Sequence, residues 1–247
     1  MGHTNRRRLL GLLAGFSSFA LHASANEPSP LVLALRKLNE NPNEANLAEV
    51  LRVWQSLQAE GRAGVRERRW VLEALLEAGR FEQAQAFALG FEVSPLPKWP
   101  KVVPLASTAS RRLWVPSADA ERLAEESWEA DLRPQLWVQA AVGCGFCRNA
   151  ARELSADEVL GPIMKSRSHW LAAGSDLLHA TEWRASFQDL PLKLVTDRQG
   201  WPFEGAWTTP RFYFVRQEKV VRMESGWPRD GSQRAALLEG FKDLGLA

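Results

Sequence analysis

The spacing of apolar residues divides the chain into a helical first part and a second part in which strand-like and helix-like segments alternate. In the first part, apolar residues recur at three- and four-residue steps from Leu47 to Leu57, which is typical of an amphipathic helix. Two further helices are predicted over residues 65–78 and 81–88. Gly61 and Gly79 follow the first two helices, where glycine often ends a helix in the left-handed conformation.

A proline-rich stretch over residues 94–106 separates the two parts, and its prolines disfavour a regular helix or an interior strand. Beyond it the pattern predicts alternating strands and helices. The strands are expected at 113–115, 136–141, 169–173 and 192–195, and the helices at 118–128 and 147–154. A hairpin of 212–215 with 220–223 and a closing helix at 237–244 follow. Such alternation indicates a parallel sheet with covering helices, here ending in an antiparallel hairpin. We therefore expect a helical domain over 26–93, a linker over 94–106 and an α/β domain over 107–247.

Residues 1–25 have the three parts of a secretion signal. Arg6, Arg7 and Arg8 precede an apolar segment over residues 9–21, and Ala23-Ser24-Ala25 forms a small-x-small cleavage site. We expect this signal peptide to direct the protein to the periplasm. The consecutive arginines resemble a twin-arginine signal, and the route stays open. An uncleaved anchor is disfavoured because the apolar segment is short for a bilayer.

The net charge of the chain without its expected signal peptide differs in sign from that of the whole sequence. The formal net charge is +2, but residues 1–25 hold three basic residues and no acidic ones, so the remainder carries −1. Such a surface offers no basic excess for nucleic acid or anionic lipid, and we expect no nucleic-acid partner.

The only two cysteines, Cys144 and Cys147, stand three residues apart where an apolar strand meets a predicted helix. Unpaired N–H groups and the helix dipole at a helix N-terminus favour a thiolate, so Cys144 is the expected reactive thiol. Cys147 lies one turn further, on the face that also carries Ala150 and Leu154, so it should be buried and able to resolve a mixed disulfide. The spacing predicts a redox centre.

Other interpretations of the two cysteines are weaker. A permanent structural disulfide would close a very small ring and contribute little chain-entropy stabilisation. Zinc would need two more ligands, and the mature chain offers only His169 and His179, which lie away from the motif. Copper transfer is conceivable for paired thiols, but no methionine or histidine lies near them. We expect no metal and no cofactor.

Two charged features near the motif also have a simple interpretation. Arg148 lowers the thiolate pKa if it turns toward the sulfur, although a solvated arginine on the helix exterior is favoured. The acidic cluster from Glu121 to Glu129 is interpreted as the solvated face of a helix.

From about Ser107 to Ala247 the chain resembles the thioredoxin-fold thiol-disulfide oxidoreductases, in particular those of the periplasm. The resemblance lies in a strand, the pair Cys144 and Cys147 at the start of a helix, then Thr208-Thr209-Pro210, a hairpin and a final helix. It implies an α/β fold with a central mixed sheet and flanking helices. It also implies that Pro210 is cis and packs beside Cys144, and that Thr209, Pro210 and Phe146 bind substrate.

The same resemblance implies disulfide exchange with exported protein substrates and a redox partner in the membrane. The Gly-Phe between the cysteines and the threonine before Pro210 resemble periplasmic disulfide isomerases, so both a reductase and an isomerase remain possible. Two residues depart from the thioredoxin pattern. Val138 stands where thioredoxins have a buried aspartate that accepts the proton of the second cysteine, and Gly143 stands where they have tryptophan.

The helical part permits a different interpretation of the whole chain. Residues 70–87 resemble one tetratricopeptide hairpin, but a single unit cannot bury a continuous core. A cap or docking element is therefore favoured over a peptide-binding groove, and it offers a possible site for a protein partner. The alternative function is a non-catalytic interaction protein in which the two cysteines sense redox state or are inert.

Overall fold

The protein is described by a computed structural model, which covers residues 28–92, 96, 98–106, 111–128, 132–203, 207–228 and 230–246. The expected signal peptide lies outside the described residues. Four helices form the first part: α1 (Pro30–Glu40), α2 (Glu44–Ala59), α3 (Val65–Glu77) and α4 (Phe81–Gly90). Gly61 and Gly79 end α2 and α3 with positive φ angles of 67° and 70°. The helices predicted from periodicity are confirmed, and α1 is added to them.

The second part is built on one mixed sheet. Its eight strands within the described residues are β1 (Lys101–Val103), β2 (Arg112–Pro116), β3 (Arg122–Ser127), β4 (Gln135–Ala140), β5 (Ser168–Ala173), β6 (Leu192–Val195), β7 (Arg211–Arg216) and β8 (Lys219–Ser225). They lie in the order β1-β3-β2-β6-β5-β4-β7-β8. Strands β4, β5 and β6 run parallel, and β7 is antiparallel to both β4 and β8.

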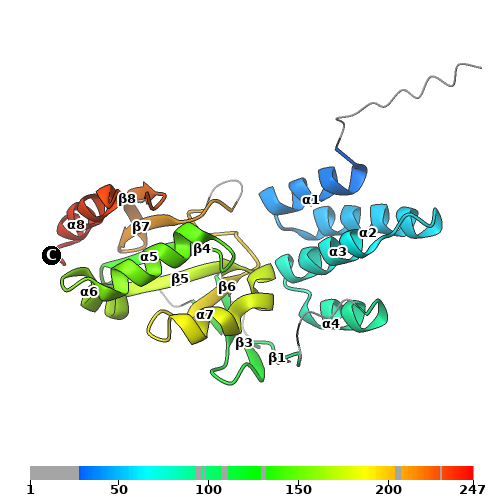
Figure 1. The fold of residues 1–247 in the computed structure, drawn as a ribbon, viewed down its shortest axis with the longest axis horizontal. Helices are drawn as coiled ribbons and strands as arrows, with labels where there is room; N and C mark the ends of the chain where they lie inside the picture. Colours follow the sequence, from blue (N-terminus) through cyan, green and yellow to red (C-terminus); the bar gives the residue numbers. More distant parts are fainter. Residues whose placement is uncertain are drawn as a thin grey trace, which may run out of the picture.

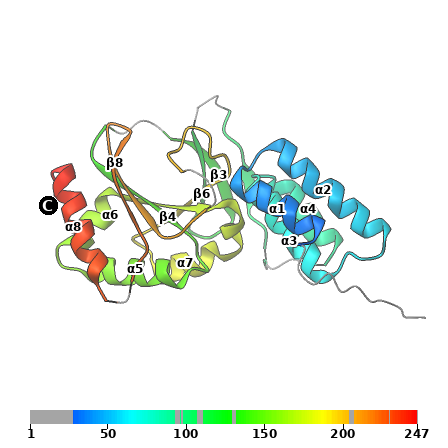
Figure 2. The ribbon, with the colours of Figure 1, turned by 90° about the horizontal axis from the view of Figure 1, so that it is seen from above.

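The two faces of this sheet are covered in different ways, because successive side chains of a strand point to opposite faces. On one face Phe212 and Phe214 of β7 join the main core with α5 (Gly145–Ala156), α6 (Leu160–Arg167), α7 (Ala180–Ser186) and α8 (Ser232–Leu244). On the other face Tyr213 joins an aromatic cluster with Trp201 and Phe203. Figure 2 shows α5 and α7 along the same side of the sheet.

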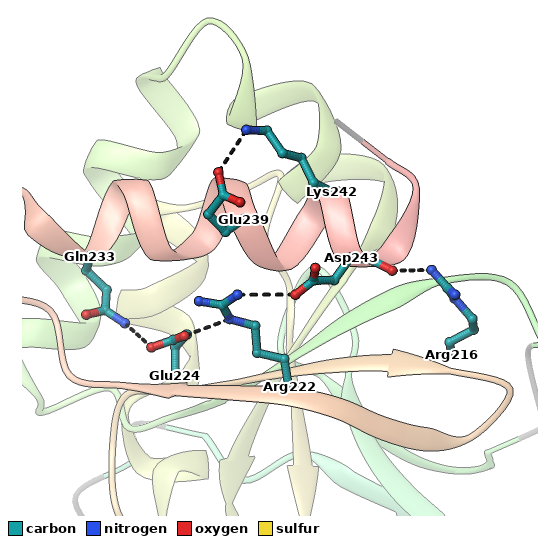
Figure 3. A network of polar contacts seen from close by, with 7 residues as sticks. All are labelled: Arg216, Arg222, Glu224, Gln233, Glu239, Lys242 and Asp243. Atoms are coloured by element: carbon teal, nitrogen blue, oxygen red, sulfur yellow. Dashed lines mark hydrogen bonds and ion pairs between the residues drawn. The ribbon is translucent and has the colours of Figure 1, made fainter.

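Helix α8 closes the fold over the β7–β8 hairpin. Phe241 packs against Phe214 with ring centroids 5.3 Å apart, and Leu237 and Leu244 of the same helix are also buried. A network of polar contacts at the surface accompanies it (Figure 3): Arg222 lies 2.7 Å from Glu224 and 3.2 Å from Asp243. Such partly exposed ion pairs contribute little to stability.

The four N-terminal helices lie at one end of the sheet and share its core (Figure 1). Helix α3 packs on the 3₁₀ helix η1 (Gly174–His179), so closely that a Cβ atom on Gly174 would lie 2.1 Å from the carbonyl oxygen of Leu76. Phe81 packs edge to face on Trp114 of β2 at 4.9 Å. The helical part is therefore joined to the sheet by backbone contact as well as by side chains.

One predicted helix is wrong. Residues 118–128 form a turn and then strand β3, whose residues pair with β2. The acidic residues there do not lie on a helix: Glu121 and Glu126 are exposed, whereas Glu125 points inward and pairs with Arg112 of β2 at 2.9 Å. Glu129 lies outside the described residues. In addition, residues 101–103 of the expected linker form β1, which is an edge strand and so tolerates the neighbouring prolines.

We predict that Gly174→Ala destabilises the protein by about 2 kcal/mol or more, because a rigid backbone oxygen occupies the place of the new methyl group. Urea unfolding measures the change. Gly90→Ala is the matched control, since a Cβ there meets nothing within 4 Å, and it should change stability by less than about 1 kcal/mol. Equal unfolding midpoints for the two variants would contradict the close packing of α3 on η1.

Candidate functional site

Strand β4 ends shortly before the two cysteines and so places them at the C-terminal end of the parallel strands. All six of its residues are buried, so the strand is fixed on both faces and along its length. The chain turns after Ala140, and the N–H of Cys144 donates to the carbonyl oxygen of Ala141 at 3.1 Å. Helix α5 begins at the next residue, with Cys144 as its N-cap. The predicted position of the pair at the start of a helix is confirmed.

The two sulfurs are in different environments. Cys147 is fully buried, whereas Cys144 is half-buried, and both are free thiols. The N–H of Cys147 donates to Sγ of Cys144 at 3.3 Å, in place of the hydroxyl or carboxylate oxygen that usually caps a helix. A negatively charged sulfur is stabilised there by the unpaired N–H groups of the first helical turn.

The surroundings move the pKa values of the two thiols in opposite directions. Partial burial opposes ionisation of Cys144, but hydrogen bonds from Cys147, Thr209 and the N–H of Phe146 outweigh it and lower the pKa of Cys144. Burial raises the pKa of Cys147 to about 12. One thiol is thus prepared to act as a nucleophile while its neighbour stays protonated, which is the arrangement that stepwise disulfide exchange requires.

The segment before β7 lies against this pair. Sγ of Cys144 is 3.8 Å from the carbonyl oxygen of Thr209, and the peptide bond between Thr209 and Pro210 is cis. Pairing of β7 with β4 brings the two segments together, although 65 residues separate Cys144 from Thr209. Phe146, the third residue expected to bind substrate, is 54% exposed and faces outward beside Cys144.

Other residues considered from the sequence lie apart from the sulfurs. Arg148 pairs with Glu182 at 2.5 Å, so its charge is directed at α7. His169 packs edge to face on Trp128, and Val138 is fully buried in β4. In the part of the chain that the structure describes, no three histidine, cysteine or acidic side chains cluster as metal ligands would.

Asp176 is a further residue beside the cysteines, and it was not predicted from the sequence. It lies in η1, directly after β5, and it is 9% exposed. Its Oδ1 accepts the N–H of Val142 at 2.8 Å, two residues before Cys144. A signal was present in the sequence, since an acidic residue follows the end of the predicted strand 169–173, and parallel strands place their functional residues at that edge.

Asp176 lines a cavity of about 320 Å³ that lies between the turn before Cys144 and the helical part. Gly143, His179 and Trp207 line it from the sheet side, and Glu77 lines it from α3. Glu77 also pairs with Arg198 at 2.7 Å, with both side chains almost buried. The helical part therefore supplies one wall of a cavity beside the cysteines.

Comparison with protein-family models and with curated proteins finds no match to this chain. Among the described residues, no helix is long and apolar enough to cross a bilayer.

We predict that iodoacetamide at neutral pH modifies Cys144 and leaves Cys147 unmodified in the folded protein. The reason is the lowered pKa and partial exposure of Cys144 and the raised pKa and burial of Cys147. Peptide mass mapping identifies the modified residue, and the urea-unfolded chain, in which both thiols should react, is the control. Equal modification of both cysteines in the folded protein would contradict this geometry.

A second prediction concerns stability and pH. Burial, reinforced by the nearby Glu77, raises the pKa of Asp176 to about 7 from its ordinary 3.8. Between pH 3.8 and about 7 the folded state keeps a proton on Asp176 that the unfolded chain has lost. The stability that this proton contributes is lost as pH rises through about 7. Relative to Asp176→Asn, the wild type should lose roughly 3 kcal/mol of unfolding free energy between about pH 5 and about pH 8.

Urea unfolding of both proteins at the two pH values measures this difference. Asp230→Asn is the control, because Asp230 is exposed and its pKa is lowered, so its removal leaves this pH window unaffected. A wild type and an Asp176→Asn variant with parallel pH dependence would show that Asp176 ionises like a solvated aspartate.

Proposed function

We propose that this protein is an exported thiol-disulfide oxidoreductase of the thioredoxin-like type, with Cys144 as the nucleophile and Cys147 as the resolving thiol. The observation that carries the proposal is the position of Sγ of Cys144. It accepts the N–H of Cys147 at the start of α5 and lies 3.8 Å from the carbonyl oxygen of Thr209. This combination supplies both a stabilised thiolate and a backbone edge beside it.

The proposed exchange has two steps. The thiolate of Cys144 attacks one sulfur of a substrate disulfide, a mixed disulfide forms, and the other substrate sulfur leaves as a thiolate and takes up a proton. Cys147 then loses its proton and attacks Sγ of Cys144, which releases the second substrate thiol and leaves a disulfide between Cys144 and Cys147. Two electrons pass from the protein to the substrate, and a membrane redox partner is the proposed source of their replacement.

The thioredoxin-like assignment is supported by the order of elements around the site. Strand β4 leads into α5 with the cysteines at its start, the cis bond before Pro210 leads into the β7–β8 hairpin, and α8 follows. The surrounding strands β1, β2, β3 and β6 extend the sheet on the far side of β5. We propose residues 107–247 as the thioredoxin-like domain, with α1–α4 as an additional helical part.

Substrate binding is proposed at the exposed surface around Cys144. Phe146 offers an apolar contact, and the backbone of Thr209 next to Pro210 offers hydrogen-bonding groups to an extended substrate segment. The proposed substrates are exported proteins with disulfides or thiols, in the periplasm. The direction of exchange, reductase or isomerase, is set by the reduction potential of the pair relative to those of its substrate and its redox partner.

The proposal predicts that the mature protein accelerates insulin reduction by dithiothreitol. Cys144→Ala should abolish the acceleration, because the nucleophile is lost. Cys147→Ala should stop after the first step and accumulate mixed disulfides with substrates at Cys144, seen as bands that reductant removes. Lys242→Ala, a change of an exposed side chain near the C-terminal end of α8, should behave as wild type.

Absence of both the acceleration and the trapped species would reject this function. The non-catalytic interaction protein would then be the better account. A reduction potential at the strongly oxidising end would exclude the reductase form of the proposal.

A further inference from the structure

A short chain of hydrogen bonds connects Asp176 to the backbone of Cys144. Oδ1 of Asp176 accepts the N–H of Val142 at 2.8 Å. The carbonyl group of the same peptide unit, which belongs to Ala141, accepts the N–H of Cys144 at 3.1 Å. One peptide group thus lies between the buried carboxyl group and the residue that begins α5.

We propose that Asp176 is a positioning residue for the thiol pair, which acts through the peptide unit between Ala141 and Val142 to hold Cys144 at the start of α5. This inference rests on the proposed function, because it takes Cys144 as the reacting residue. Nothing in the sequence pattern around the cysteines assigns such a role, since Asp176 comes from a different strand connection.

The physical effect follows from the polarisation of linked hydrogen bonds. A carboxylate is a stronger acceptor than a neutral carbonyl group, and it polarises the peptide unit whose N–H it binds. The carbonyl oxygen of Ala141 then binds the N–H of Cys144 more strongly. The backbone of Cys144 is held so that Sγ stays within 3.3 Å of the N–H of Cys147. A backbone hydrogen bond of Ala141 also favours the thiolate form of Cys147, so the same turn serves both sulfurs.

The groups that face Asp176 determine the pH at which its carboxyl group ionises and polarises the turn. Glu73 and Glu77 of α3 and His179 of η1 line the cavity with it, and Arg198, from the loop after β6, pairs with Glu77. Burial and Glu77 raise the pKa of Asp176 to about 7, while the N–H of Val142 opposes the shift. The carboxylate therefore forms as pH rises through 7, and the turn is held more strongly above that pH than below it.

Two effects of the ionised carboxylate on Cys144 have opposite signs. Direct charge repulsion would disfavour the thiolate, whereas the linked hydrogen bonds favour it. Cys144 is half-buried, so solvent screens the repulsion, and the hydrogen-bond path runs through a single peptide unit. The proposal therefore predicts that the carboxylate increases the reactivity of Cys144.

The test is the rate of iodoacetamide alkylation of Cys144 against pH, in a Cys147→Ser background, with Asp, Asn or Ala at position 176. Below pH 7 the Asp176 and Asn proteins should react equally, because both offer a neutral carbonyl acceptor to Val142. Above pH 7 the Asp176 protein should be about fivefold faster than Asn, the effect of one strengthened hydrogen bond. The Ala variant should be slow at every pH.

An Asn variant that reacts as fast as Asp176 above pH 7, or faster, would overturn the proposal, because repulsion or no coupling would then describe the site. If the Ala variant does not fold, the comparison of Asp with Asn still decides. Asp230→Asn, which removes an exposed carboxyl group on the segment before α8 and leaves the groups around Asp176 intact, is the matched control and should leave the profile unchanged. Alkylation needs no disulfide substrate, so failure of the proposed oxidoreductase activity would appear separately, in the insulin assay.

Discussion

The hydrogen bond from the N–H of Cys147 to Sγ of Cys144 is the interaction on which the site depends. It exists because β4, buried along its whole length, ends at Ala140, and because α5 begins only a few residues later. Because the connection between β4 and α5 is so short, Cys144 lies at the helix N-terminus, where N–H groups lack partners. Its sulfur takes the place of a capping oxygen, and its ionised form gains most from that position.

The rest of the molecule supports this short turn from several directions. Pairing of β7 with β4 brings Thr209 and Pro210 against the sulfur. The packing of α3 on η1 buries Asp176, which binds the turn from the other side. A buried, ionisable carboxyl group costs stability at neutral pH, and the fold nevertheless retains it where it contacts the turn before Cys144. The helical part is thus connected to the site through α3, since Glu77 contributes to the burial and charge that shift the pKa of Asp176.

The sequence predicted those features whose causes are local. Helix α2 and helix α3 were predicted from apolar periodicity and from the glycines that end them. Strand β4 and the start of α5 were predicted from the apolar run before Cys144. The wrong prediction was the helix at 118–128, where alanine and glutamate residues have helical propensity. Cross-strand pairing with β2 overrides that propensity, and the ion pair of Arg112 with Glu125 allows an acidic side chain to point inward. Such pairing depends on a neighbouring strand and is not visible in a single segment.

The role of Asp176 could not be predicted for the same kind of reason. Its burial needs α3, which lies about 100 residues earlier in the chain, to pack against the close approach at Gly174. Val138 stands where thioredoxins have a buried aspartate, and the only sequence signal for Asp176 was its place directly after the predicted strand 169–173. Residues that are brought together by tertiary packing alone leave only weak traces in a single sequence.

The most direct test of the central claim is a pH titration of the Cys144 thiol, followed by thiolate absorbance in a Cys147→Ser protein, folded and unfolded in urea. The account predicts that the folded protein titrates at a lower pH than the unfolded chain, because the N–H groups at the start of α5 stabilise the thiolate. A folded protein that titrates at the same pH as the unfolded chain, or at a higher one, would contradict it.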